Sequence, residues 1–220
     1  MSITQNILSF KNSIPLSVTL IAVSKTKPNA SIIEAYETGH CHFGENYVQE
    51  LVDKYEQLPK NINWHFIGHL QSNKVKYIAP FVYLIHGVDS FSLLKEINRQ
   101  ALKNNRVINC LLQIYIAQEE TKFGLSFTEA ETILNSVEFK ELKNIAIKGF
   151  MAMASNTDDE QQIRKEFQSL TKFSKSFPNL QPPFSILSMG MSADYKIAID
   201  EGSTMIRIGS SIFGERDYSV

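Results

Sequence analysis

The sequence has few cysteines and no excess of charge of either sign. Cys41 and Cys110 are the two cysteines among 220 residues, and 22 basic residues face 23 acidic ones. Two distant cysteines form neither a disulfide framework nor a metal-ligand spacing, which favours a reducing compartment. No apolar run reaches the length of a membrane span, and residues 1–10 lack the basic start and continuous apolar core of a signal peptide. We therefore expect a cytoplasmic protein that binds neither a membrane nor nucleic acid.

The chain does contain a regular alternation of strand-like and helix-like segments. Ile3–Ser13 predicts a helix ahead of the first strand. Eight apolar segments, each followed by an amphipathic one, predict strands at Ser17–Val23, His40–Phe43, Asn63–Ile67, Val82–Val88, Val107–Ala117, Asn144–Met153, Phe184–Met189 and Thr204–Ile208. Such alternation without a long linker predicts a TIM-type (β/α)8 barrel with an extra N-terminal helix, and residues 1–220 as a single domain. A doubly wound open sheet is the alternative.

Polar residues follow most of the predicted strands, at the end where such barrels place their active sites. They include no carboxylate pair suited to glycoside hydrolysis and no set of zinc ligands. His65 and His69 are four residues apart on a strand and a turn, where they would not share a metal, and His40, His42 and His86 read as ordinary strand histidines. The strand-end residues are Lys25, Asn46, His69 with Gln71, and the segments 122–124, 153–156, 188–192 and 207–211.

The loops after the seventh and eighth strands favour an anion. They read Ser188–Ser192 and Arg207–Ser211, and both combine glycine with hydroxyl side chains. Glycine lets backbone N–H groups approach an anion, and Ser192 precedes a predicted helix, Ala193–Ile199, whose N-terminus attracts negative charge. For either loop alone, ordinary turn chemistry is the simpler explanation. Together, at the position where barrels often hold phosphate, the two loops predict a phosphate site.

Two cations complete the pattern. Lys25 ends the first strand at the mouth of an apolar core, where a lysine can lose its proton and condense with an aldehyde. Arg207 lies within the last strand, where a buried arginine needs a partner, either an acidic side chain or the ring nitrogen of a cofactor. An arginine opposite a pyridine nitrogen would keep that nitrogen unprotonated. Lysine, arginine and phosphate loops outline a pyridoxal phosphate site.

Five motifs carry a resemblance to a known family. The chain resembles the pyridoxal phosphate homeostasis proteins, single-domain barrels related to the N-terminal domain of alanine racemase. The match runs in order from about Ser17 to Arg216, and several long motifs in the right order are far more specific than one loop. The motifs are Ala22–Pro28, Phe43–Tyr47, Trp64–Lys74, Leu187–Asp194 and Gly202–Gly209.

The resemblance implies a site and a role. It implies pyridoxal 5′-phosphate held as an aldimine on Lys25 and a protein that buffers the cofactor, with apo-enzymes that use it as candidate recipients. The resemblance does not assign individual roles to the polar residues of the loop 152–156. The implied cofactor contacts are the phosphate at Ser192, Gly209 and Ser210, Arg207 near the pyridine nitrogen, and Asn46, His69 and Met189 lining the pocket.

Two enzymatic readings stay open beside this one. The first is a pyridoxal phosphate-dependent racemase or lyase. Racemisation needs a base on each face of the substrate carbon, and in alanine racemase the second base comes from a domain for which this sequence shows no counterpart. We therefore expect no efficient turnover, although a weak racemase-type activity is compatible with the site. The second is a barrel enzyme that forms a Schiff base between Lys25 and a phosphorylated substrate. We expect a monomer.

Overall fold

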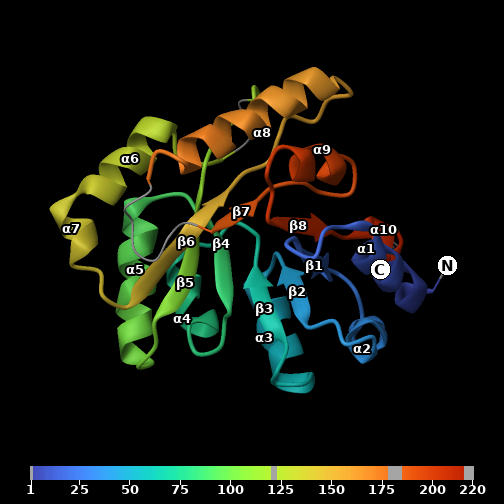
Figure 1. The fold of residues 1–220 in the computed structure, drawn as a ribbon. Coiled ribbons are helices and arrows are strands. Elements are labelled where there is room, and N and C mark those ends of the chain that lie inside the picture. The colour runs from blue at the N-terminus through green and yellow to red at the C-terminus, as the bar shows by residue number, and fades with distance from the viewer. Residues whose placement is uncertain (1, 120–122, 178–184, 216–220) are drawn as a thin grey trace.

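The computed structural model describes residues 2–119, 123–177 and 185–215, and its strands form one closed parallel barrel (Figure 1). Each strand pairs with the next, and β1 pairs with β8. The barrel is therefore confirmed over the open sheet. The strands are β1 (Thr19–Val23), β2 (His42–Glu45), β3 (Asn63–Phe66), β4 (Leu84–Val88), β5 (Ile108–Gln113), β6 (Ile145–Met151), β7 (Ile186–Ser188) and β8 (Met205–Ile208).

Helices surround this barrel in chain order (Figure 1). The predicted N-terminal helix is present as α1, and Asn6 Nδ2 donates to the Ile212 carbonyl at 2.9 Å, which joins α1 to α10. Within the described ranges, no helix has the length and apolar character that crossing a membrane requires. The helices are α1 (Ile3–Ser13), α2 (Asn29–Glu37), α3 (Val48–Gln57), the 3-10 turn η1 (Ser72–Lys74), α4 (Val75–Ile78), α5 (Phe91–Lys103), α6 (Phe127–Asn135), α7 (Val137–Lys140), α8 (Glu160–Ser174), α9 (Tyr195–Asp200) and α10 (Ser210–Phe213).

Element boundaries differ from the predicted ones for local reasons. The predicted strand 107–117 ends at Gln113, because the apolar residues beyond it belong to a loop in which Ile114 makes a single bridge to Leu125. The predicted helix 127–137 is split at Ser136, whose hydroxyl accepts from the Phe139 amide and starts α7. The seventh strand begins at Ile186, and Phe184 lies outside the described residues.

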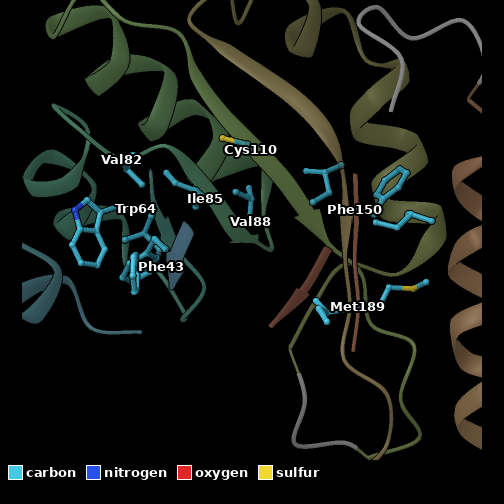
Figure 2. Close-up of a cluster of buried hydrophobic side chains, with 14 of the residues drawn as sticks. Phe43, Trp64, Val82, Ile85, Val88, Cys110, Phe150 and Met189 are labelled. Atoms are coloured by element: carbon cyan, nitrogen blue, oxygen red, sulfur yellow. The ribbon is translucent and has the colours of Figure 1, made fainter. Parts of the chain in front are cut away.

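Side chains of the strands alternate between two apolar layers. The larger layer lies between the strands and the helices and includes Phe43, Trp64, Phe150 and Met189 (Figure 2). The smaller one fills part of the barrel lumen and consists of Ile21, Leu84, Leu111, Met151 and Met205.

The rest of the lumen is polar, unlike the branched aliphatic layers that are typical of this fold. Arg207 lies two residues after Met205 on β8, so its side chain also faces the lumen. By the same alternation, His86 follows Leu84 into the lumen from β4. The lumen thus joins apolar packing to buried polar groups that need hydrogen-bond partners.

Candidate functional site

The carboxyl ends of β1 and β8 meet in a small cavity. Because Ala22 pairs with Ile208, the residues that follow both strands emerge side by side. The cavity has a volume of about 120 Å³. The structure therefore brings together three residues that the sequence singled out separately, namely Lys25, Gly209 and Ser210. The lining residues are Val23, Lys25, Lys27, Gly209, Ser210 and Gly214.

One wall of this cavity is the start of α10, a short helix that the sequence did not predict. The amides of Ile212 and Phe213 donate to the Gly209 carbonyl at 2.9 and 3.0 Å. The amides of Ser210 and Ser211 precede them in the first turn, where an N–H group has no intrahelical acceptor. This wall therefore offers backbone donors and hydroxyl groups to an anion.

Residues on both sides of Lys25 are held by a buried ion cluster. Lys54 Nζ, on α3, donates to the Ser24 carbonyl at 2.8 Å, to Glu45 Oε1 at 2.8 Å and to Glu50 Oε1 at 2.6 Å. The Ser24 hydroxyl also donates to Glu45 Oε1, at 2.6 Å. Sequence reasoning missed this cluster, although the Glu50–Lys54 spacing of one helical turn is a signal for an ion pair.

The same cluster supports a strained turn. Thr26 has φ of +61°, a left-handed conformation that a β-branched residue rarely adopts. Its amide donates to Glu50 Oε1 at 2.6 Å, so the cluster holds the turn immediately after Lys25. Lys25 itself is half-buried between these two anchored neighbours.

Glu45 is the most deeply buried charged member of the cluster. Burial raises the pKa of its carboxyl to about 7, although the positive charge of Lys54 acts in the opposite direction. Glu45 Oε1 accepts two hydrogen bonds, whereas the buried Oε2 has no partner among the described residues. A proton on Oε2 near neutral pH is consistent with this arrangement.

Arg207 lies in the lumen with neutral acceptors around its guanidinium. Its Nη1 donates to the carbonyl and the hydroxyl of Ser188, both at 2.7 Å, and Nη2 donates to the Ala152 carbonyl at 3.1 Å. Burial lowers the pKa of Arg207 to about 10, while the charge of Asp194 raises it. The side chain is therefore cationic at neutral pH. These bonds leave N–H groups of the guanidinium available to a further acceptor.

Ser192 lies in a turn whose helix begins later than predicted. The helix α9 starts at Tyr195 rather than at Ala193. Asp194 is buried, and its Oδ1 accepts from the Met191 amide at 2.6 Å. The turn thus contains a carboxylate already bonded to one of its amides, which the sequence reading, focused on hydroxyls and glycines, did not weigh.

Asn46 and His69 lie together in a second cavity of about 420 Å³, which Tyr47, Gln71 and Lys74 also line. Asn46 directly follows β2, and its buried Oδ1 has no hydrogen-bond partner within the described ranges. His69 is exposed, and its Nδ1 lies 3.2 Å from Asp89 Oδ2. The orphaned amide oxygen is the stronger sign of a ligand, because a buried acceptor without a donor is costly.

The remaining predicted residues lie elsewhere. Met189 has no exposed surface and packs in the core outside the lumen (Figure 2). Lys122, in the predicted segment 122–124, lies outside the described residues. Where the structure describes the chain, no group of three or more His, Cys, Asp or Glu side chains is arranged to hold a metal ion.

Sequence comparisons place the chain among known proteins. Residues 1–217 match the family model described as the N-terminal domain of alanine racemase. A pyridoxal phosphate homeostasis protein of Vibrio alginolyticus is 41% identical over 210 residues, which cover 93% of this chain and 89% of that protein. The protein of the same name from Escherichia coli K12 is 39% identical over 212 residues, covering 93% and 88%.

Solved structures agree with this placement. PipY of Synechococcus elongatus without PLP gives a TM-score of 0.89 at 34% identity, covering 97% of this chain and 100% of that one. PipY with PLP bound gives 0.87 at 34% identity with the same coverage. An alanine racemase of Clostridium difficile shares the fold, with a TM-score of 0.81 at 15% identity over 99% of this chain and 58% of that one. By sequence identity over nearly its whole length and by its barrel, the chain belongs to the pyridoxal phosphate homeostasis protein family.

Proposed function

We propose that this chain is a single pyridoxal phosphate-binding barrel domain that serves in pyridoxal phosphate homeostasis and holds the cofactor as a Schiff base on Lys25 without efficient turnover. One observation carries the proposal, which is that Lys25, Gly209 and Ser210 line the same cavity. An amine and an anion-binding wall in one cavity suit a molecule that carries both an aldehyde and a phosphate. The names of the relatives and the PLP-bound PipY structure support the same ligand.

The residues present fit the cofactor group by group. Gly209 and Ser210 offer donors to the phosphate, with Ser192 as a further hydroxyl from the neighbouring turn. Arg207 has N–H groups left to donate to a ring nitrogen. The orphaned Oδ1 of Asn46 calls for a donor, and His69 shares its cavity. Met189 has no exposed surface, so we infer that it supports the site from the core rather than lining it.

The chemistry of Arg207 favours holding over turnover. The bound cofactor supplies an electron sink for carbanions when its ring nitrogen is protonated. A cationic arginine donating to that nitrogen keeps it unprotonated and weakens the sink. Racemisation also needs a base on each face of the substrate carbon, and Lys25 supplies one.

An absorption spectrum tests the proposal directly. Purified protein incubated with pyridoxal 5′-phosphate should turn yellow, and borohydride should remove the absorption band and leave a reduced label on the peptide that contains Lys25. Lys27 lines the same cavity and provides a matched control. Lys25→Ala should abolish the label, while Lys27→Ala should keep it. Colourless wild-type protein, or a label on a different lysine, would contradict the proposal.

A further inference from the structure

Three histidines form a continuous hydrogen-bonded row inside the barrel. His42 Nδ1 lies 3.0 Å from His65 Nε2, and His65 Nδ1 lies 2.9 Å from His86 Nε2. His86 Nδ1 lies 3.0 Å from the Ser188 hydroxyl, which accepts from Arg207 at 2.7 Å. The row thus crosses from β2, β3 and β4 to β7 and β8. We call these three residues the histidine row.

The row ends at opposite places in the barrel. His65 and His86 are fully buried. His42 is half-buried and lines a cavity of about 300 Å³, together with His40, Cys41 and residues that precede β1. Because His42 begins β2, this cavity lies at the amino ends of the strands, opposite the cavity of Lys25. The row therefore links the far mouth of the barrel to Arg207.

Arg207 gives the row a direction. A guanidinium only donates, so the Ser188 hydroxyl accepts from Arg207 and has its own proton left to donate. We assign His86 Nδ1, at 3.0 Å, as the acceptor of that proton, which places the ring proton of His86 on Nε2. His86 Nε2 then donates to His65 Nδ1, and His65 Nε2 donates to His42 Nδ1. Each ring thus accepts at Nδ1 and carries its proton on Nε2. The row ends at Asn63, whose side-chain Nδ2 lies 3.5 Å from His42 Nε2, and turning that amide over places its oxygen there as the acceptor of the last proton.

The surroundings keep the row neutral. Burial lowers the pKa of both His65 and His86 well below the ordinary value, and the charge of Arg207 lowers that of His86 further. His40 and His42 act in the same direction on His65. Among the residues that the structure describes, the other ring facing the row is that of Tyr83, whose centroid lies 5.2 Å from that of His65 and 5.7 Å from that of His42. Neutral imidazoles can each accept at one nitrogen and donate from the other, as the row requires.

We propose that His86, His65 and His42 are positioning residues for Arg207, because their shared tautomer gives the Ser188 hydroxyl an acceptor and so holds that hydroxyl as an acceptor for the guanidinium. The role toward the cofactor rests on the proposed function, in which Arg207 meets the ring nitrogen. The row itself is a property of the protein without ligand. Two experiments test these two claims separately: the existence of the row in the free protein and its effect on cofactor binding.

The first experiment reads the tautomers. Long-range ¹H–¹⁵N correlation NMR of the ¹⁵N-labelled protein, without cofactor, distinguishes Nδ1–H, Nε2–H and doubly protonated rings, and exposed His69 gives an internal reference. We expect His65 and His86 to be neutral with the proton on Nε2 at pH 7.5. In Ser188→Ala the signals of both rings should change, because the row loses its fixed end. Protons on Nδ1 in the wild type would overturn the assigned tautomer and with it the positioning role. Unchanged His65 signals in the variant would show that the row does not couple His65 to Ser188.

The second experiment measures cofactor retention by equilibrium dialysis. His86→Gln keeps an acceptor and a donor in the row, whereas His86→Leu keeps neither. We expect His86→Leu to raise the dissociation constant for pyridoxal 5′-phosphate about tenfold, one buried hydrogen bond's equivalent, and the glutamine variant to stay within about twofold. Leu111→Ala, which opens space in the lumen and removes no hydrogen-bonding group, controls for general loosening.

Each outcome has one meaning. Equal weakening by His86→Leu and Leu111→Ala, or by the leucine and glutamine variants, would overturn the positioning role and leave only a packing role. A wild-type protein that takes up no pyridoxal 5′-phosphate would overturn the proposed function and with it any role toward the cofactor. In that case the NMR experiment, which needs no cofactor, still tests whether the three histidines form the hydrogen-bonded row.

Discussion

Lys54 donates a hydrogen bond of 2.8 Å to the carbonyl oxygen of Ser24, the residue that directly precedes Lys25. The same ammonium group bonds Glu45 and Glu50, so one buried cation links the helix α3 to the turn that carries Lys25. Removing that cation would take from the buried Glu45 both its counter-charge and a hydrogen-bond donor, and would leave the partly exposed Glu50 without its ion pair. The position of Lys25 and the stability of the barrel therefore depend on a common group.

We expect Lys54→Met to lower the free energy of unfolding by about 3 kcal/mol, because breaking a buried ion pair leaves an uncompensated charge. Urea unfolding at pH 7 measures this. Lys103→Met, an exposed lysine on α5, should change stability by less than about 0.5 kcal/mol. The double variant Lys54→Met with Glu45→Gln should recover part of the loss, since the most buried partner of Lys54 is then a neutral amide. No recovery would show that charge is not the cause.

Acid should destabilise the protein below pH 6.5. Burial lowers the pKa of His40 to about 4 and that of His65 and His86 well below 6.5. Between the folded and unfolded pKa values the unfolded chain binds more protons, so stability is lost as the pH falls. Each such histidine contributes up to about 1.4 kcal/mol per pH unit. Urea unfolding at pH 7.5, 6.5 and 5.5 gives the slope, and a flat profile would contradict the neutral row.

Glu45 should oppose this trend. Its folded pKa is raised to about 7 from 4.5, so the folded state holds a proton that the unfolded state releases. The resulting stabilisation is fully present below pH 4.5 and is lost as the pH rises through 7. Glu45→Gln removes the opposing contribution. Its stability should therefore fall more steeply with acid than that of the wild type, by about 1.4 kcal/mol per pH unit between pH 7 and 4.5. If the stability of the two proteins changed equally with pH, the pKa of Glu45 would not be raised in the folded state.

A negative charge at the start of α10 should exclude the phosphate. Ser210→Asp favours the helix N-terminus and so should not lower stability, yet it repels an anion in the cavity of Lys25. We expect retention of pyridoxal 5′-phosphate to weaken at least about tenfold, equivalent to about 1.4 kcal/mol. Pyridoxal, which lacks the phosphate, is the matched ligand, and its binding should change little. Equal loss for both ligands would argue against a phosphate at this wall.

Catalysis should be slow. Incubation with single L-amino acids in the presence of pyridoxal 5′-phosphate, followed by chiral analysis, should give racemisation far below about one turnover per second, the lower end of ordinary enzyme rates. Lys25→Ala should abolish what activity there is. Turnover at ordinary rates would favour the racemase or lyase alternative over a holding protein.

The barrel and the Lys25 cavity follow from patterns that sequence carries well. Eightfold alternation predicted the strands, and a closed barrel sets its first strand beside its last, which is why Lys25 and Gly209 line one cavity. Strand alternation could have placed Arg207 in the lumen. It could not have named Ser188 as its acceptor, because that pairing depends on side-chain rotamers across two strands.

The parts that the sequence concealed are long-range polar contacts. His86 and Ser188 are 102 positions apart, so their hydrogen bond leaves no local pattern, and His42, His65 and His86 look like isolated strand residues. Lys54 sits on an amphipathic helix where a lysine is usually solvated, and its burial depends on Glu45 from another element. Asp194 was visible beside Ser192, but its hydrogen bond to the Met191 amide needed coordinates.

The left-handed backbone of Thr26 has a consequence for ligand affinity. Such a conformation costs on the order of 1–3 kcal/mol, and here folding supplies that energy through the bond from the Thr26 amide to Glu50. The turn beside Lys25 is therefore already ordered before a ligand arrives. Binding need not order the loop, and more of the contact energy is expressed as affinity. Glycine at position 26 would relieve the backbone strain and make the turn more flexible. The folded state would then be less strained, and the affinity for the ligand would be lower.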